Sequence, residues 1–293
     1  MAEESGEAAA PAAQRVMMIG GAMRSGTTVI HRALCTAGNS NPFISESWFL
    51  RDLLAMYRFR LARFEAMGED QFGPAAAYGR MLAEDVEDYV RAVSARHGGP
   101  EILILKHPEL IRNFADLAGL APAMLFLAVV RDPRDVVASM KRVRDSHARD
   151  GIPGPLAGAR TIAGLCDYYG SHYGPLLDAA PALGARLKMV RYEDFMRSPA
   201  DAVAEIGAYC GARYEMQKVA DFRPDHAASA TFDKKARADD PFSRAFWSDL
   251  YTKPLSGERI GRFAESLSPP EIREIEARLA FVGRRFGYWG ERA

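Results

Sequence analysis

Residues 21–28, with the sequence GAMRSGTT, combine the residue types that bind a phosphate or sulfate group. Gly21 and Gly26 follow an apolar run and precede a helical pattern, so the backbone can curl until its N–H groups face an anion. A helix that starts at the end of this loop adds the positive end of its dipole. Further donors come from four side chains: Arg24, Ser25, Thr27 and Thr28. This pattern predicts an anion site; the alternative is a glycine-rich turn that binds nothing.

The loop departs from that of the P-loop nucleotide triphosphatases in the position of its charge. Those enzymes carry a lysine where this chain has Thr27, and here the fixed positive charge is on Arg24. We therefore expect a bound phosphate without the usual triphosphate and Mg²⁺. A P-loop kinase remains an alternative, because Asp132 ends a predicted strand as a Walker B aspartate does. A non-catalytic nucleotide-binding protein is a second alternative.

A second anion site is predicted where another apolar run ends. Arg131 follows this run, and Ser139 lies eight residues later, about two helical turns on. Asp132 and Asp135 are interpreted as helix N-terminal residues that pair with Arg134. The alternative is a surface ion-pair cluster. Two separate anion sites suit a nucleotide that carries phosphate groups at both ends.

The periodicity of the sequence indicates the strands and helices that would position these residues. Short apolar runs predict buried strands at residues 16–19, 102–105, 124–130 and 187–190. Helical patterns occupy residues 27–34, 47–67, 75–96, 135–143 and 269–285. Apolar strands that alternate with helices predict an α/β fold, with a central parallel sheet flanked by helices in three layers. In such sheets the ligand binds at the carboxyl ends of the strands.

Composition narrows the class of protein. The 293 residues include 38 basic and 38 acidic side chains, so we expect no nucleic-acid partner. No run of apolar residues is long enough for a membrane span, and the three cysteines are widely spaced, which favours a cytoplasmic protein. The histidines show no metal-ligand spacing. We expect a disordered tail at residues 1–14 and a single domain at residues 15–293.

Five short motifs resemble the sulfotransferases that use 3′-phosphoadenosine-5′-phosphosulfate (PAPS). The motifs are RSGTT (24–28), KHPEL (106–110), RDPRDVVAS (131–139), RYEDF (191–195) and YTKPLSGERIGRF (251–263). The resemblance covers about residues 16–285. It is closer to bacterial members and to the tyrosylprotein sulfotransferases than to the phenol-type enzymes, which carry lysine in place of Arg24.

The resemblance implies a P-loop-like fold and a role for each motif. The loop at residues 24–28 would hold the 5′-phosphosulfate, and Arg131 with Ser139 would hold the 3′-phosphate. Three further residues are assigned to the cofactor by their motifs: Tyr192, Lys253 and Arg262. The acceptor would be a hydroxyl on a small molecule or glycan, bound by residues 42–72 and 151–173, and the protein could form an oligomer.

Sulfuryl transfer needs cations at the leaving group and a base at the acceptor. Arg24 and Lys106 are the candidate cations, and no metal is expected. Two candidate bases remain. Glu46 lies one residue beyond the position of the catalytic glutamate in tyrosylprotein-type relatives. His107 resembles the catalytic histidine of the phenol-type enzymes, although there one residue separates it from the lysine. Glu46 is slightly favoured.

Overall fold

The computed structural model describes residues 14–215, 218–219, 240, 242 and 255–290. Its four strands are β1 (Arg15–Gly20), β2 (Ile102–Lys106), β3 (Leu125–Val130) and β4 (Leu187–Arg191). They form one parallel sheet in the order β2-β1-β3-β4, which confirms the predicted strands and their direction. The apolar runs are short and continuous because β1, β2 and β3 are buried on both faces of the sheet over most of their length.

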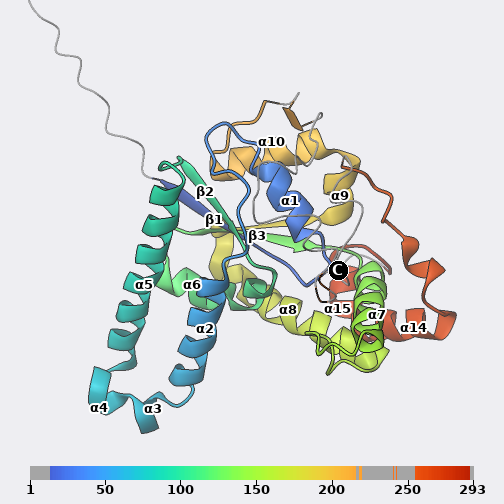
Figure 1. Cartoon of the computed structure of the whole chain (residues 1–293), viewed down its shortest axis with the longest axis horizontal. Helices are drawn as coiled ribbons and strands as arrows, with labels where there is room; N and C mark the ends of the chain where they lie inside the picture. The colour runs from blue at the N-terminus through green and yellow to red at the C-terminus, as the bar shows by residue number, and fades with distance from the viewer. Residues whose placement is uncertain (1–13, 216–217, 220–239, 241, 243–254, 291–293) are drawn as a thin grey trace, which may run out of the picture.

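Helices cover both faces of this sheet, as the predicted three-layer fold requires (Figure 1). One face packs on α1 (Thr27–Leu34), α9 (Tyr192–Arg197) and α10 (Pro199–Cys210) through alternate strand residues such as Met17 and Leu127. The opposite face, with Met18 and Phe126, packs on the remaining helices. These include α2 (Trp48–Leu61), α5 (Ala75–Arg96), α6 (Phe114–Leu120), α7 (Pro133–Arg149), α8 (Ile162–Leu183), α14 (Pro269–Arg278) and α15 (Ala280–Arg285).

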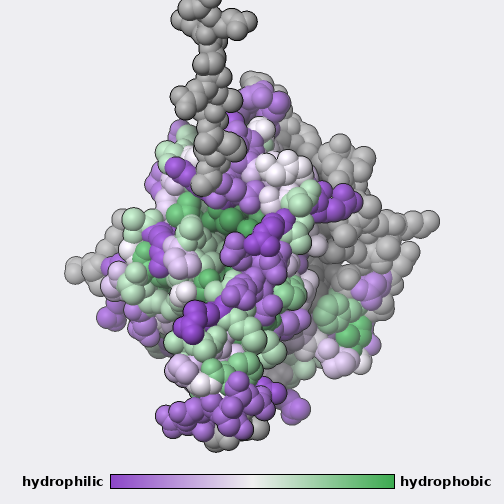
Figure 2. Space-filling model, turned by 90° about the vertical axis from the view of Figure 1, so that its left-hand side faces the viewer, coloured by the Kyte–Doolittle hydropathy of each residue, from purple (hydrophilic) through white to green (hydrophobic). Residues whose placement is uncertain are grey.

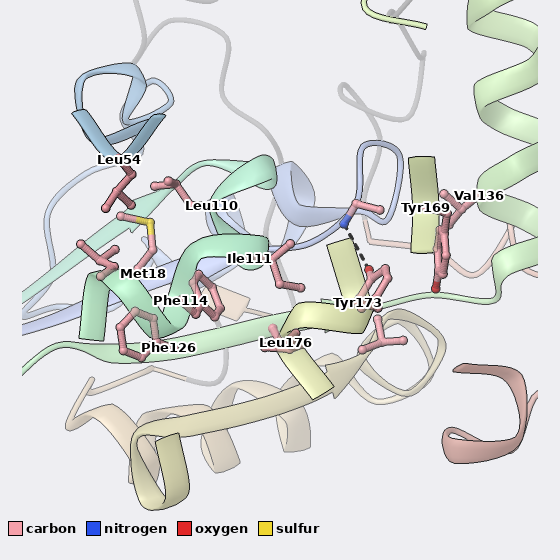
Figure 3. Packing of buried hydrophobic residues seen from close by; sticks show 14 of the residues in the cluster. Met18, Leu54, Leu110, Ile111, Phe114, Phe126, Val136, Tyr169, Tyr173 and Leu176 are labelled. Atoms are coloured by element: carbon pink, nitrogen blue, oxygen red, sulfur yellow. Dashed lines mark hydrogen bonds between the residues drawn. The ribbon is translucent and has the colours of Figure 1, made fainter. Parts of the chain in front are cut away.

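Two tyrosines of α8 connect the core to the predicted anion loop (Figure 3). Tyr169 and Tyr173 are fully buried. The hydroxyl of Tyr173 donates to the carbonyl oxygen of Val129 at 2.7 Å and accepts from the backbone N–H of Ala22 at 3.2 Å. This buried hydroxyl has both a donor and an acceptor, so it fixes the start of the loop against the end of strand β3.

Several helix boundaries differ from the prediction for local reasons. The helix expected at residues 47–67 is two helices, α2 and α3 (Phe64–Met67), because Arg63 leaves the helical conformation with φ −126°. The helix expected at 269–285 breaks at Leu279, where φ is −108°. In the other direction, α7 runs six residues beyond Val143, since its polar last turns carry no apolar signal. The 22-residue helix α8 was not predicted, because Pro175 and Pro181 lie inside it and proline is unfavourable within a helix.

The helices α2 and α5 extend from the sheet as an arm, whose end is formed by α3 and the short helix α4 (Glu69–Phe72) (Figure 1). From the side of α5, hydrophilic side chains gather at this end, while the rest of the face mixes hydrophilic and hydrophobic residues (Figure 2). Among the described residues, no helix is long and apolar enough to span a bilayer. The predicted tail falls almost entirely on residues 1–13, outside the described residues, and the single domain stays a prediction.

Candidate active site

Parallel pairing brings the ends of the strands to one edge of the sheet. Ile19 pairs with Lys106, and Val130 pairs with Arg191, so the strands finish side by side. The segments that follow them are the loop at residues 21–26, His107, and Arg131. The predicted motifs therefore meet at one edge because of strand register, although more than 100 residues of sequence separate the first from the third.

The anion loop turns through two residues of positive φ. Gly26 has φ 95°, and a Cβ atom there would lie 2.4 Å from the ring of Tyr192, so only glycine fits. Arg24 has φ 71°, an uncommon conformation for a residue with a side chain, of a kind that concentrates at binding sites. In the described structure, the first turn of α1 has no acidic residue and no side-chain cap. Its N–H groups and positive dipole end are thus directed at the loop.

Three residues selected from the sequence form a contact group beside this loop, which we call the acid–base group: Thr28, Glu46 and Lys106. The ammonium of Lys106 lies 3.3 Å from Thr28 Oγ1 and 2.5 Å from Glu46 Oε1. The Lys106 side chain is 3% exposed, whereas the Glu46 side chain is 30% exposed. A backbone hydrogen bond from Ser47 N–H to the Lys106 carbonyl holds the two segments together. The group therefore offers a buried cation and a carboxylate that solvent can reach.

His107 lies next to this group, but its side chain is in a different, more apolar environment. Its ring is buried, and neither ring nitrogen has a hydrogen-bond partner within the described structure. Burial is the main reason that its pKa falls to about 4, so the imidazole is neutral near pH 7. The indole of Trp48 packs edge-on against it at 4.7 Å. The His107 side chain makes no capping hydrogen bond to the following 3-10 helix (Pro108–Asn113).

The second predicted anion site adjoins the first. Arg24 donates from Nε to Ser139 Oγ at 3.1 Å, and Arg131 donates from Nη1 to the Arg24 carbonyl at 3.4 Å. The guanidinium of Arg131 lies over the Tyr192 ring at 4.4 Å. Tyr192 therefore packs between Gly26 and Arg131, where it supports both anion sites.

Two further arginines, not selected from the sequence, complete what we call the arginine cluster: Arg24, Arg131, Arg142 and Arg259. Arg142 donates to Ser139 Oγ at 3.2 Å. Its pKa is lowered by burial and then by the charges of Arg24, Arg259, Arg131 and Arg262. Arg142 lies one turn after Ser139 on the same helix, a spacing that could have identified it. Arg259 lies within the motif at residues 251–263, from which only Lys253 and Arg262 were selected.

Asp135 connects the motif at residues 251–263, which we call the late segment, to this cluster. Its carboxylate accepts from the backbone N–H groups of Gly261 at 2.8 Å and Phe263 at 3.0 Å. It also lies 3.5 Å from Arg131, while burial raises its pKa. The expected pairing of Asp135 with Arg134 is wrong. The carboxylate of Asp135 instead accepts hydrogen bonds from the backbone of the late segment and contacts Arg131.

The expected role of Asp132 is confirmed. It caps the first turn of α7 and contacts Arg134 at 2.7 Å.

The remaining members of the predicted site are less central. Arg262 is 51% exposed on its side chain and pairs with Glu265 at 2.7 Å. Lys253 lies outside the described residues. In the RYEDF motif, Glu193 is buried and accepts from the Asp132 N–H and from the Tyr288 hydroxyl, so this part of the motif holds the fold together. Across the described residues, no cluster of three or more His, Cys, Asp or Glu side chains has metal-site geometry.

Comparisons with known proteins bear on the family and the fold of the chain. The model of the sulfotransferase family matches residues 17–216 of the chain. The sulfotransferase domain from the curacin biosynthetic pathway is 15% identical, with a TM-score of 0.53 over 92% of this chain and 98% of that one. Sulfotransferase STF9 from Mycobacterium avium is 15% identical, with a TM-score of 0.52 over 94% of this chain and 77% of that one. No curated protein sequence matches. The structural likeness supports the P-loop-like α/β fold.

Proposed function

The chain belongs to the sulfotransferase family, and we propose that it transfers the sulfuryl group of PAPS to an acceptor hydroxyl and releases 3′-phosphoadenosine 5′-phosphate. One observation carries the assignment of the donor. Arg24 and Arg142 both donate to the Ser139 hydroxyl, and burial, followed by the charges of the neighbouring arginines, lowers the pKa of Arg142. Like charges so close together are stabilised by an anion of two charges, such as a 3′-phosphate.

The 5′-phosphosulfate would lie at the loop of residues 24–28. The backbone N–H groups of the loop and of α1 would hold its oxygens, with Ser25, Thr27 and Thr28 supplying further donors. Lys106 would neutralise the charge that develops on the leaving phosphate, because its buried ammonium already lies against Thr28. Arg24 would add a second cation from the side of the arginine cluster. The late segment, with Arg262 and Lys253, would complete the nucleotide site.

Glu46 is the better candidate for the base that takes the acceptor proton. It contacts Lys106, which contacts the loop, so a hydroxyl bound to Glu46 would lie beside the sulfuryl group. It is also the more accessible of the two candidates. His107 is buried, so an acceptor hydroxyl reaches it less readily than it reaches Glu46.

We place the chain with the bacterial and tyrosylprotein-type branch of the family. Arg24 stands in the loop where the phenol-type enzymes have lysine, and the contact between Glu46 and Lys106 offers a carboxylate base. Both features distinguish this site from one that uses histidine.

Calorimetric titration with 3′-phosphoadenosine 5′-phosphate, without Mg²⁺, tests the proposal. We expect tight binding of this product, weak binding of ATP, and a loss of about a hundredfold on Arg131→Ala, since a buried arginine–phosphate contact contributes roughly 2–3 kcal/mol. Arg91→Ala is the matched control, because Arg91 is exposed on α5 and, within the described part of the chain, its ion pairs are with Glu87 and Asp88. Equal binding of ATP, or no binding of the product, would contradict the proposal and favour a P-loop kinase or a different role.

A further inference from the structure

Strand β2 lies at an edge of the described sheet, so one row of its backbone N–H and C=O groups faces away from β1. The segment that connects α1 to α2 covers this row. The Ile102 N–H donates to the Asn39 carbonyl at 3.1 Å, and the Ile102 carbonyl accepts from the Asn41 N–H at 3.4 Å. Further along, the Ser47 N–H donates to the Lys106 carbonyl at 2.9 Å. The segment is thus fixed to the strand at both ends.

Between these ends, the side chain of Asn41 takes the place of a backbone peptide group. Its Oδ1 atom accepts from the Ile104 N–H at 2.6 Å, and its Nδ2 atom donates to the Ile104 carbonyl at 3.1 Å. The Nδ2 atom also donates to the Pro42 carbonyl at 2.9 Å. Asn41 is fully buried, so these hydrogen bonds are shielded from water. The side chain therefore pairs with both groups of Ile104, and the main chain is released from the strand.

The released stretch is longer than the strand beside it. Ser47 lies six residues after Asn41 in the sequence. The strand residues bonded to them, Ile102 and Lys106, are only four residues apart. Both chains span the same distance, so the surplus of the segment must bend away from the strand. We call residues 42–46, which make this bend, the arch.

The arch is held from two sides and carries Glu46 at its end. Pro42 begins it, since proline has no N–H that could pair with the strand. The ring of Phe43 packs on α1, with its centroid 5.0 Å from that of the His31 ring. Glu46 then contacts the ammonium of Lys106 at 2.5 Å. The position of the candidate base thus depends on where the arch leaves the strand.

We propose that Asn41 is a positioning residue for the base of the sulfuryl transfer: its side chain takes over the pairing of β2 and lets the arch place Glu46 against Lys106. The proposal rests on the proposed function, which assigns the base to Glu46. If the main chain itself paired with Ile104, the segment would stay extended beside the strand. Glu46 would then lie about two residues further along the strand, beyond Lys106.

Trace labelling of lysine amines tests the position of the arch without an acceptor. The protein is exposed briefly to acetic anhydride, and mass spectrometry gives the rate of acetylation at Lys106. The Lys106 side chain is 3% exposed, so the reagent reaches it slowly while Glu46 lies against it. In Asn41→Ala the rate should rise by about fivefold or more, because the arch loses its hydrogen bonds to the strand and opens. Asn41→Ser takes its place if the alanine variant does not fold.

Asn39→Ala is the matched control for this measurement. Asn39 is another buried asparagine of the same segment. Its side chain bonds to Glu101, Gly211 and Arg213, none of which belongs to the arch. This variant should lose a similar amount of stability in urea and keep the acetylation rate within about twofold of the unsubstituted chain. An equal rise in both variants, or no rise in Asn41→Ala, would overturn the proposal.

Slow transfer from PAPS to water separates positioning from a general effect on stability. This reaction releases sulfate and 3′-phosphoadenosine 5′-phosphate, and Glu46 takes a proton from the water. Asn41→Ala should lower the rate constant by about tenfold with product affinity nearly unchanged, because a misplaced catalytic group slows the reaction without weakening nucleotide binding. In a Glu46→Gln background the same change should cost less than about twofold, since the group that Asn41 positions is already absent.

An equal loss of rate in both backgrounds would also overturn the proposal, because Asn41 would then act independently of Glu46. The proposed function fails in a different way. A chain that does not bind 3′-phosphoadenosine 5′-phosphate would overturn that function, whereas acetylation of Lys106 would still report whether Asn41 holds the arch.

Discussion

The acid–base group and the arginine cluster lie on the same edge of the sheet but differ in their balance of charge. In the acid–base group, one ammonium meets one carboxylate at 2.5 Å, so the charges match. In the arginine cluster, two of the four guanidinium groups donate to the Ser139 hydroxyl, and the other two act on Arg142 through their charge. The carboxylate of Asp135 contacts Arg131. The first arrangement is complete without a ligand, whereas the second is relieved by an anion.

This difference separates chemistry from binding. A carboxylate held beside the buried ammonium can take the proton of the acceptor hydroxyl, which suits a reaction at that hydroxyl. An excess of positive charge attracts and orients a phosphate, but it does not by itself lower a reaction barrier. Substitutions in the two regions should therefore divide between turnover and affinity.

The largest effect is expected from Lys106→Met. Removing the buried ammonium should reduce turnover by about a thousandfold, since one preorganised donor to a developing charge contributes roughly 3–4 kcal/mol. Affinity for 3′-phosphoadenosine 5′-phosphate should fall by about tenfold at most. Steady-state kinetics and calorimetry on the same preparation measure both quantities. A variant that loses affinity and turnover equally would place Lys106 in the binding region.

Glu46→Gln sharpens the comparison by removing the proposed base while keeping its size. Turnover should fall by about a hundredfold or more, within the usual range for general-base catalysis, with product affinity nearly unchanged. His107→Gln is the paired variant and should cost less than about tenfold. The reverse order of these losses, measured by steady-state kinetics, would transfer the role of base to His107.

Arg142→Ala tests the arginine cluster. Affinity for 3′-phosphoadenosine 5′-phosphate should fall by about tenfold to thirtyfold, because one charge-assisted contact is lost from a site that retains three other guanidinium groups. Calorimetry at two salt concentrations should show that the variant depends less on salt than the parent. An unchanged affinity and salt dependence would show that the anion binds elsewhere.

A global effect concerns the stability of the fold against pH. Burial, the largest cause in each case, lowers the pKa of His31 and His172 to about 3 and that of His107 to about 4. The unfolded chain therefore binds protons near pH 6.5 that the folded chain does not, so stability falls as the pH drops from about 6.5 towards 4.

Urea unfolding at pH 7.5 and 5.5 measures this loss. Each of the three histidines should contribute about 1.4 kcal/mol over that interval. His172→Gln should reduce the pH dependence by about a third. A free energy of unfolding that does not change over the interval would mean that these histidines are protonated in the folded protein.

The sequence determined the strands and the loop chemistry because both are local. Continuous apolar runs identify strands buried on two faces, and Gly26 marks a conformation that only glycine adopts beside Tyr192. The same local signals misplaced helix ends, as at Arg63 and Leu279, where no glycine or proline interrupts the pattern. Helical turns that pack weakly against the core contain few regularly spaced apolar residues, so the hydrophobic pattern does not show where they end.

Only the tertiary structure decided how the charged groups are shared. Strand register placed Lys106 against Thr28 and Glu46. The path of the late segment allows Asp135 to accept hydrogen bonds from Gly261 and Phe263 instead of pairing with Arg134. Arg142 and Arg259 joined the arginine cluster in the same way. Charge pairs depend on distance and burial, which a sequence does not contain, whereas the tendency to form a strand or a tight loop belongs to the residues themselves.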